Sequence, residues 1–95
     1  MSTAAGPVPY KCTSVFDETS LPEALRREHR TKPGVWAIIR VLEGRLRYQV
    51  LDPASETVLT PDRPGLVWPE QPHRVEPMGA MRMQVEFYRE MPGLH

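Results

Sequence analysis

The chain has 95 residues, of which 40% are hydrophobic and 25% charged, a composition typical of one globular domain with a modest core. Lysine plus arginine and aspartate plus glutamate number 12 each, so the formal net charge is zero, which argues against nucleic acid as a partner. The sequence has no long apolar run, and its single cysteine, Cys12, excludes an internal disulfide. Residues 1–9 have neither a basic region nor an apolar run, so we expect that they are not a signal peptide. We therefore expect a cytoplasmic protein without a membrane partner.

The predicted elements are short and mostly extended, because 11 prolines and 6 glycines interrupt the chain. We expect a flexible tail over residues 1–9, a single domain over residues 10–89 and a frayed C-terminus over residues 90–95. The first strand is predicted over Tyr10–Phe16, which is rich in residues that favour strands.

One short helical turn is predicted near residues 21–26. Ser20 and Glu23 have the spacing of a capping box, and Pro22 falls at the first helical position. We expect an extended approach to the next strand from Arg27 to Arg30, after which the sequence Thr31-Lys32-Pro33-Gly34 forms a turn.

The strongest strand signal is the nearly continuous apolar run Val35–Leu42, which predicts a strand with both faces covered. After Glu43-Gly44, the segment Arg45–Leu51 alternates between apolar and polar residues. This alternation predicts a half-buried strand, and we expect it to pair with the strand before it.

Four more strands are predicted in the second half of the chain, over residues 56–60, 66–68, 73–76 and 81–88. The last of these places an apolar stripe on one face, formed by Met81, Met83, Val85 and Phe87. Six to eight short strands with closely spaced turns are typical of an all-β sandwich or small barrel.

Two histidines are candidates for a binding site. His73 follows a stiff turn containing Pro69 and Pro72, and His29 precedes the strongest strand. Either ring is also compatible with a structural, hydrogen-bonded role. Two imidazoles with a carboxylate would form an open site for Zn²⁺ or Fe²⁺, with Glu86 as the candidate third ligand.

Three further residues are candidates for contacting a bound small molecule. Glu76 lies three residues after His73, and therefore on the opposite strand face unless a bulge intervenes. Trp36 and Trp68 belong to the core in one interpretation and stack on a ligand in the other. The chain has no nucleophile elbow and no glycine-rich phosphate loop, so no catalytic residue is assigned.

Five segments together carry a resemblance to a known family: Leu21-Pro22, Glu28-His29-Arg30-Thr31-Lys32-Pro33-Gly34-Val35-Trp36, Val41-Leu42-Glu43-Gly44, Pro69-Glu70-x-x-His73-Arg74-Val75-Glu76 and Phe87-Tyr88. Their order and spacing resemble the small cupin-like domain at the N-terminus of some bacterial tellurite-resistance B proteins, which also occurs as a free-standing protein. The resemblance extends from about Tyr10 to Tyr88.

The resemblance implies a double-stranded β-barrel of the cupin, or jelly-roll, type, with His29 and His73 at its mouth. In cupins, histidines and a glutamate hold a divalent metal. This sequence departs from that pattern, since Ala37 stands where the first motif has glutamate and Pro77 replaces the usual asparagine of the second. In the longer family members a methyltransferase domain follows. Because these 95 residues contain no glycine-rich loop for a methyl donor, we expect no methyltransferase activity here.

These observations predict a small cupin-like protein that binds a divalent metal ion or a small molecule in the barrel mouth, in a tellurite or oxyanion stress response. One alternative is a metal-dependent enzyme of the oxygenase or isomerase type. Another is a structural module in which the methionine-rich stripe of residues 81–87 packs against a second copy as a homodimer.

Overall fold

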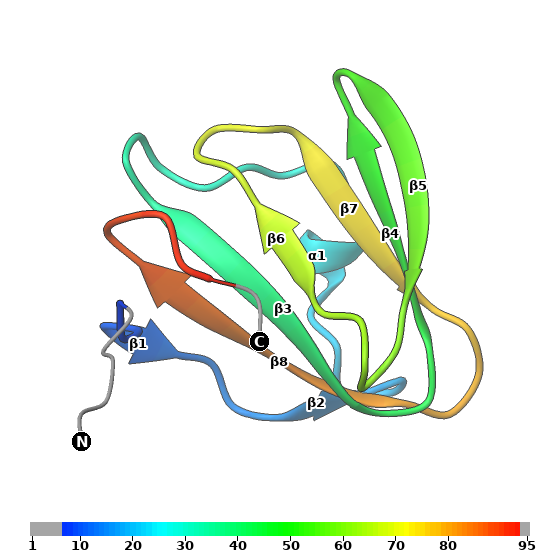
Figure 1. Cartoon of the computed structure of the whole chain (residues 1–95). Coiled ribbons are helices and arrows are strands. Elements are labelled where there is room, and N and C mark those ends of the chain that lie inside the picture. Colours follow the sequence, from blue (N-terminus) through cyan, green and yellow to red (C-terminus); the bar gives the residue numbers. More distant parts are fainter. Residues whose placement is uncertain (1–6, 94–95) are drawn as a thin grey trace.

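The computed structural model describes residues 7–93, which form two antiparallel sheets and one short helix (Figure 1). The elements are β1 (Lys11–Cys12), β2 (Phe16–Asp17), α1 (Glu23–Arg26), β3 (Trp36–Glu43), β4 (Leu46–Leu51), β5 (Ala54–Leu59), β6 (Gly65–Val67), β7 (His73–Pro77) and β8 (Arg82–Tyr88). The expectations for the two ends of the chain fall partly on residues 1–6 and 94–95, which lie outside the described residues.

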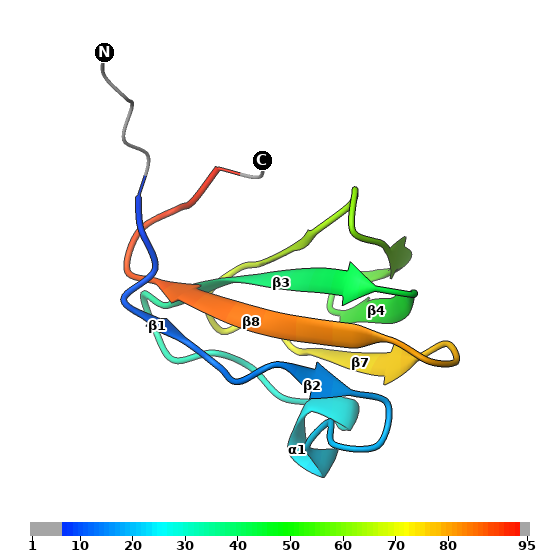
Figure 2. The same cartoon turned by 90° about the horizontal axis from the view of Figure 1, so that it is seen from below.

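The larger sheet has the strand order β1-β8-β3-β6, with β2 also paired to β8. Its centre is the long antiparallel pair of β3 and β8, which begins at Trp36↔Tyr88 and shifts register between Val41 and Glu43. Figure 2 shows β1 and β2 following one another along the edge of β8. The single first strand expected over residues 10–16 is therefore two short strands.

The smaller sheet has the order β5-β4-β7, and this corrects one prediction. The segment that contains β4 was expected to pair with the strand before it, but β4 pairs with β5 and β7 instead. The reason is that both edges of β3 are already occupied, by β6 and β8. Gly44, with a φ of 77°, provides the left-handed backbone at which the chain turns into the second sheet.

The core lies between the two sheets, and it follows the predicted alternation of residues. Leu46 and Tyr48 of β4 are buried, whereas Arg47 and Gln49, which alternate with them, are only partly covered. Met83 and Val85 of β8 are buried in the same core. Because the methionine-rich stripe faces the interior of its own domain, a homodimer would have to use another surface.

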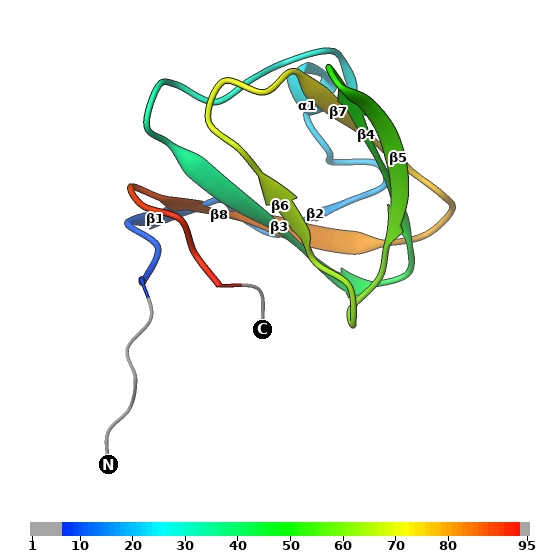
Figure 3. The ribbon, with the colours of Figure 1, turned by 45° about the horizontal axis from the view of Figure 1, so that its top comes forward.

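The fold is mostly β, as predicted, but over residues 7–93 the strands form two separate sheets and no closed barrel. Figure 3 shows β4, β5 and β7 on one side of the interior and β3, β6 and β8 on the other. The segment after α1 crosses between the two sheets at the end where β7 begins.

The short helix is present, but the capping box is not. Pro22 occupies the N-cap of α1 and offers no side-chain hydrogen bond. Ser20 Oγ instead accepts a hydrogen bond from the Asp17 backbone N–H at 2.8 Å, which tightens the turn before the helix. Within residues 7–93 no helix is long and apolar enough to cross a membrane.

Candidate ligand-binding cavity

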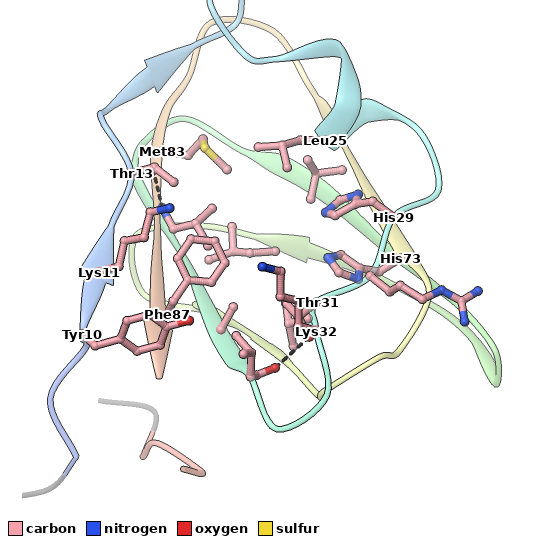
Figure 4. A pocket seen from close by; sticks show the side chains of 17 residues that line it. Tyr10, Lys11, Thr13, Leu25, His29, Thr31, Lys32, His73, Met83 and Phe87 are labelled. Atoms are coloured by element: carbon pink, nitrogen blue, oxygen red, sulfur yellow. Dashed lines mark hydrogen bonds between the residues drawn. The ribbon is translucent and has the colours of Figure 1, made fainter. Parts of the chain in front are cut away.

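A cavity of about 320 Å³ opens between the sheets at the end where β7 begins (Figure 4). Its wall is mainly apolar and is formed by Leu25, Val35, Ala37, Ile39, Val67, Val75, Met83, Val85 and Phe87. The polar and charged lining residues are Tyr10, Lys11, Thr13, His29, Arg30, Thr31, Lys32 and His73. A mainly apolar wall with a few polar groups is the usual form of a small-molecule site.

His29 and His73 lie side by side in this cavity. The two residues form an isolated antiparallel bridge, in which the His29 N–H donates to the His73 carbonyl at 3.0 Å and the His73 N–H donates to the His29 carbonyl at 2.9 Å. Their ring centroids are 4.0 Å apart. The extended approach predicted for residues 27–30 is what makes this bridge, since it lets the chain add briefly to the free edge of β7.

Each imidazole is held by the backbone two residues before it. His29 Nδ1 lies 3.0 Å from the Arg27 carbonyl oxygen, and His73 Nδ1 lies 2.7 Å from the Gln71 carbonyl oxygen. A carbonyl oxygen only accepts hydrogen bonds, so Nδ1 of both rings carries the proton. In a neutral ring Nε2 then presents its lone pair, and neither Nε2 has a hydrogen-bond partner within residues 7–93.

His73 is a neutral ring at physiological pH. Burial lowers its pKa from 6.5 to about 4, and the neighbouring His29 acts in the same direction, while the bond to Gln71 partly opposes them. The ring also meets the edge of Tyr48, at a centroid distance of 5.9 Å. Burial raises the pKa of Tyr48 to about 12, and its hydroxyl donates to the Leu66 carbonyl at 2.9 Å. When both rings are neutral, the site therefore offers two lone pairs on an apolar background.

The two glutamates proposed as ligands lie away from the cavity. Glu76 alternates with His73 and Val75 on β7, so it faces solvent, where it pairs with Arg47 at 3.3 Å. Glu86 alternates with Val85 and Phe87 on β8, and it pairs with Arg40 at 3.1 Å and accepts from the Tyr88 hydroxyl at 2.7 Å. Among residues 7–93 no group of three histidine, cysteine or acidic side chains is placed to hold a metal ion.

The two tryptophans also contact each other and not the cavity. Their ring centroids are 5.0 Å apart, and neither ring lines the cavity. Trp36 alternates with the cavity-lining Ala37 on β3, and its side chain is therefore on the outer face of the larger sheet. Trp68 is 52% exposed at the end of β6. Of the six residues selected from the sequence, only His29 and His73 come together in the cavity.

Lys11, Thr31 and Lys32 line the cavity although sequence reasoning did not select them. Thr31 fixes the rim, because its Oγ1 donates to the Val35 carbonyl at 2.7 Å and accepts from the Glu70 N–H at 3.2 Å. One signal in the sequence pointed to Lys32, namely the basic run that it forms with Arg26, Arg27 and Arg30, which is compatible with a solvated face or with an anion-binding patch. Nothing in the sequence showed that residues so far apart would meet.

Fold and site together define a small two-sheet β domain with a ligand-sized cavity and a histidine pair in its wall. A family model described as the TehB-like domain matches residues 11–85, and the chain belongs to this family. The resemblance to the tellurite-resistance B domain, inferred from five sequence segments, is thereby confirmed.

Individual relatives agree with this assignment. TehB proteins from two strains of Haemophilus influenzae, each named a probable S-adenosyl-L-methionine-dependent methyltransferase, are 35% and 33% identical over 72 residues, or 70% of this chain. The chain spans about a quarter of the length of these curated relatives, since the match covers 25% of each.

Solved structures show the same fold. The crystal structure of TehB from H. influenzae superposes with a TM-score of 0.78 and 28% identity, covering 87% of this chain and 31% of that one. The crystal structure of a protein from Escherichia coli strain K12 superposes with a TM-score of 0.82 at 17% identity, covering 95% and 97%. The second likeness concerns the fold alone.

Proposed function

We propose that this protein is a small-ligand-binding domain in which the cavity holds an organic molecule and the Nε2 atoms of His29 and His73 anchor it. The observation that carries the proposal is the paired imidazoles, both oriented by backbone carbonyls and both open at Nε2, in the wall of an otherwise apolar cavity of about 320 Å³. A ligand hydroxyl or N–H group would donate to these lone pairs, while the apolar wall would bury the rest of the molecule.

A divalent ion such as Zn²⁺ or Fe²⁺ is the second candidate ligand, and one observation favours it. Histidines that bind metals commonly donate their other ring N–H to a carbonyl, as both rings do here. With Glu76 and Glu86 turned away, the remaining positions around such an ion would have to be filled by the small molecule or by water. The proposal assigns no catalytic step to this site.

The TehB-like family relates to tellurite resistance, and we extend this relation to the present chain as a proposal. The cavity would bind its ligand as part of an oxyanion stress response, in a cupin-like jelly-roll of the kind implied by the sequence resemblance. Comparing tellurite tolerance of cells that carry the wild type with cells that carry His73→Asn checks this role. Equal tolerance of the two strains would contradict it.

Nuclear magnetic resonance of the ¹⁵N-labelled imidazoles tests the binding proposal directly. The probes are 1-octanol, octanoate and Zn²⁺, each titrated into the metal-free protein. We expect both rings to show the Nδ1–H tautomer, and at least one probe to shift the Nε2 resonances together with the methyl signals of the cavity wall.

The matched variant is His73→Asn. The asparagine amide can still donate a hydrogen bond to the Gln71 carbonyl, but the acceptor Nε2 of the imidazole is removed. For a probe anchored at Nε2, His73→Asn should weaken binding by roughly tenfold, the effect of losing one hydrogen bond in a desolvated site. The proposal is wrong if none of the three probes shifts the Nε2 signals.

A further inference from the structure

The charges around the cavity are all of one sign. Lys11, Arg30 and Lys32 line it, and no aspartate or glutamate does so among residues 7–93. This departs from the whole chain, in which acidic and basic residues are equal in number at 12 each. Because Arg30 is paired with Glu28 at 3.3 Å, the uncompensated charge belongs to the two lysines.

The two lysines differ from several of the arginines in their ion pairing. Five arginines form ion pairs with glutamates in the described part of the chain: Arg27, Arg30, Arg40, Arg47 and Arg82. Neither lysine has a carboxylate partner within residues 7–93. Lys11 Nζ instead lies 6.0 Å from the centroid of the cavity-lining Phe87 ring. Figure 4 shows Lys32 extending into the cavity in the direction of Phe87.

The two lysines reach the mouth from different parts of the fold. Lys11 belongs to β1 at the edge of the larger sheet, and Lys32 belongs to the segment that leads from the histidine bridge into β3. An ammonium is a compact point charge on a flexible stem, so both can converge on one anionic group placed between them.

We propose that the cavity selects organic anions, in which a carboxylate is held at the mouth by Lys11 and Lys32 and an apolar body packs between the two sheets. This inference rests on the proposed ligand-binding function and names its ligand class. The histidines do not hold the carboxylate. As neutral Nδ1–H tautomers they present lone pairs, which accept hydrogen bonds and give none to a carboxylate, so the carboxylate is held by the lysines.

The apolar wall explains why an organic body is needed. Nine of the lining residues are aliphatic, methionine or phenylalanine, and burying apolar ligand surface against them is favourable. A small inorganic oxyanion would leave this wall uncovered and would have to lose its hydration. A carboxylate at the mouth keeps part of its hydration and gains two charge-assisted contacts.

A comparison of octanoate, 1-octanol and inorganic sulfate by isothermal titration calorimetry tests the proposal. We expect octanoate to bind roughly tenfold more tightly than 1-octanol, as a charge-assisted contact allows, and sulfate not to compete. Octanoate binding should weaken as NaCl is raised, whereas 1-octanol binding should not.

The double variant Lys11→Gln/Lys32→Gln should lose the preference for octanoate and retain the affinity for 1-octanol. Arg63→Gln is the matched control, because it also removes an exposed positive charge but lies in the turn before β6 and does not line the cavity. Urea denaturation of each variant establishes that it is folded.

Reductive methylation with ¹³C-formaldehyde gives a second measurement. The protein should show two lysine signals besides that of the terminal amine, and octanoate should move both lysine signals. If 1-octanol binds as tightly as octanoate, or if the double variant keeps the preference, the anion inference is overturned while the ligand cavity stands. If neither compound binds and Zn²⁺ also fails, the proposed function itself is wrong.

Discussion

The interior between the two sheets has a packed end and an open end. At the packed end Leu46, Leu59 and Met81 are at most 2% exposed, and a Cβ added at Gly65 would lie 2.7 Å from Leu59 Cδ1. At the open end, His29 and His73 line a cavity of about 320 Å³. A small domain has little apolar surface to bury. This one concentrates its close packing at one end, which leaves the other end free to accommodate a ligand.

The largest difference between the two ends should appear in a pair of leucine truncations. Leu46→Ala removes a fully buried side chain at the packed end and should lower the free energy of unfolding by about 3 to 5 kcal/mol. Leu25→Ala changes a partly buried residue that lines the cavity and lies within α1, where alanine favours the helix. This variant should lower the free energy of unfolding by only about 1 kcal/mol. Urea denaturation measures both, and equal losses would remove the distinction between the ends.

Lowering the pH should destabilise the open end through His73. Its pKa is about 4 in the folded protein and 6.5 in the unfolded chain, so between these values only the unfolded chain binds the proton. The free energy of unfolding should therefore fall by up to roughly 3 kcal/mol as pH decreases from 6.5 to 4, and this group should contribute no pH dependence above 7.

The variant His73→Asn isolates this effect, because it removes the titrating ring and leaves the other ionisable groups in place. Its urea stability should vary less with pH than that of the wild type over the same range. Parallel pH profiles for the two proteins would show that the ring titrates normally in the folded state.

Alanine substitutions at two glycines with the same backbone conformation allow the effect of steric crowding to be measured apart from that of backbone strain. Gly44 and Gly34 both have a φ of 77°, so alanine at either position carries the same left-handed strain of about 1 kcal/mol. A Cβ at Gly44 would press on the Ala80 carbonyl oxygen and on Met81, whereas nothing lies within 4 Å of one at Gly34.

Gly44→Ala should therefore destabilise the protein by about 2 kcal/mol more than Gly34→Ala, the range expected for overpacking. Thermal unfolding followed by circular dichroism compares the two variants. Similar melting temperatures would mean that the chain around Ala80 can move aside without loss.

The smallest effect is expected on the outer face of the larger sheet. Glu86→Gln removes the ion pair with the partly covered Arg40 and should lower the free energy of unfolding by about 1 kcal/mol or less. Because Glu86 faces away from the cavity, octanoate affinity and the imidazole ¹⁵N shifts should remain unchanged. A change in either would place Glu86 in the binding site.

Much of the strand pattern was predictable because its signals are local. Apolar and polar residues alternate in β4 and β8, and the structure buries the faces that this alternation indicated. The short helix near residues 21–26 and the extended approach to His29 followed from proline and glycine positions. Strand partners were not predictable in this way, since a regular alternation pairs equally well with several neighbours. The assignment of β4 to the second sheet required knowing that β3 had no free edge.

The same distinction between local sequence signals and tertiary packing applies to the candidate site. The sequence alone determined that the chain is a small β domain with its charges balanced, that it belongs with the tellurite-resistance B domains, and that His29 and His73 are its notable polar residues. Tertiary structure alone decided that Glu76, Glu86 and the tryptophans face elsewhere and that Lys11 and Lys32 line the same cavity. The physical reason is that alternation fixes which residues share a face of one strand, whereas a cavity is formed by faces of strands that only the packing of two sheets brings together.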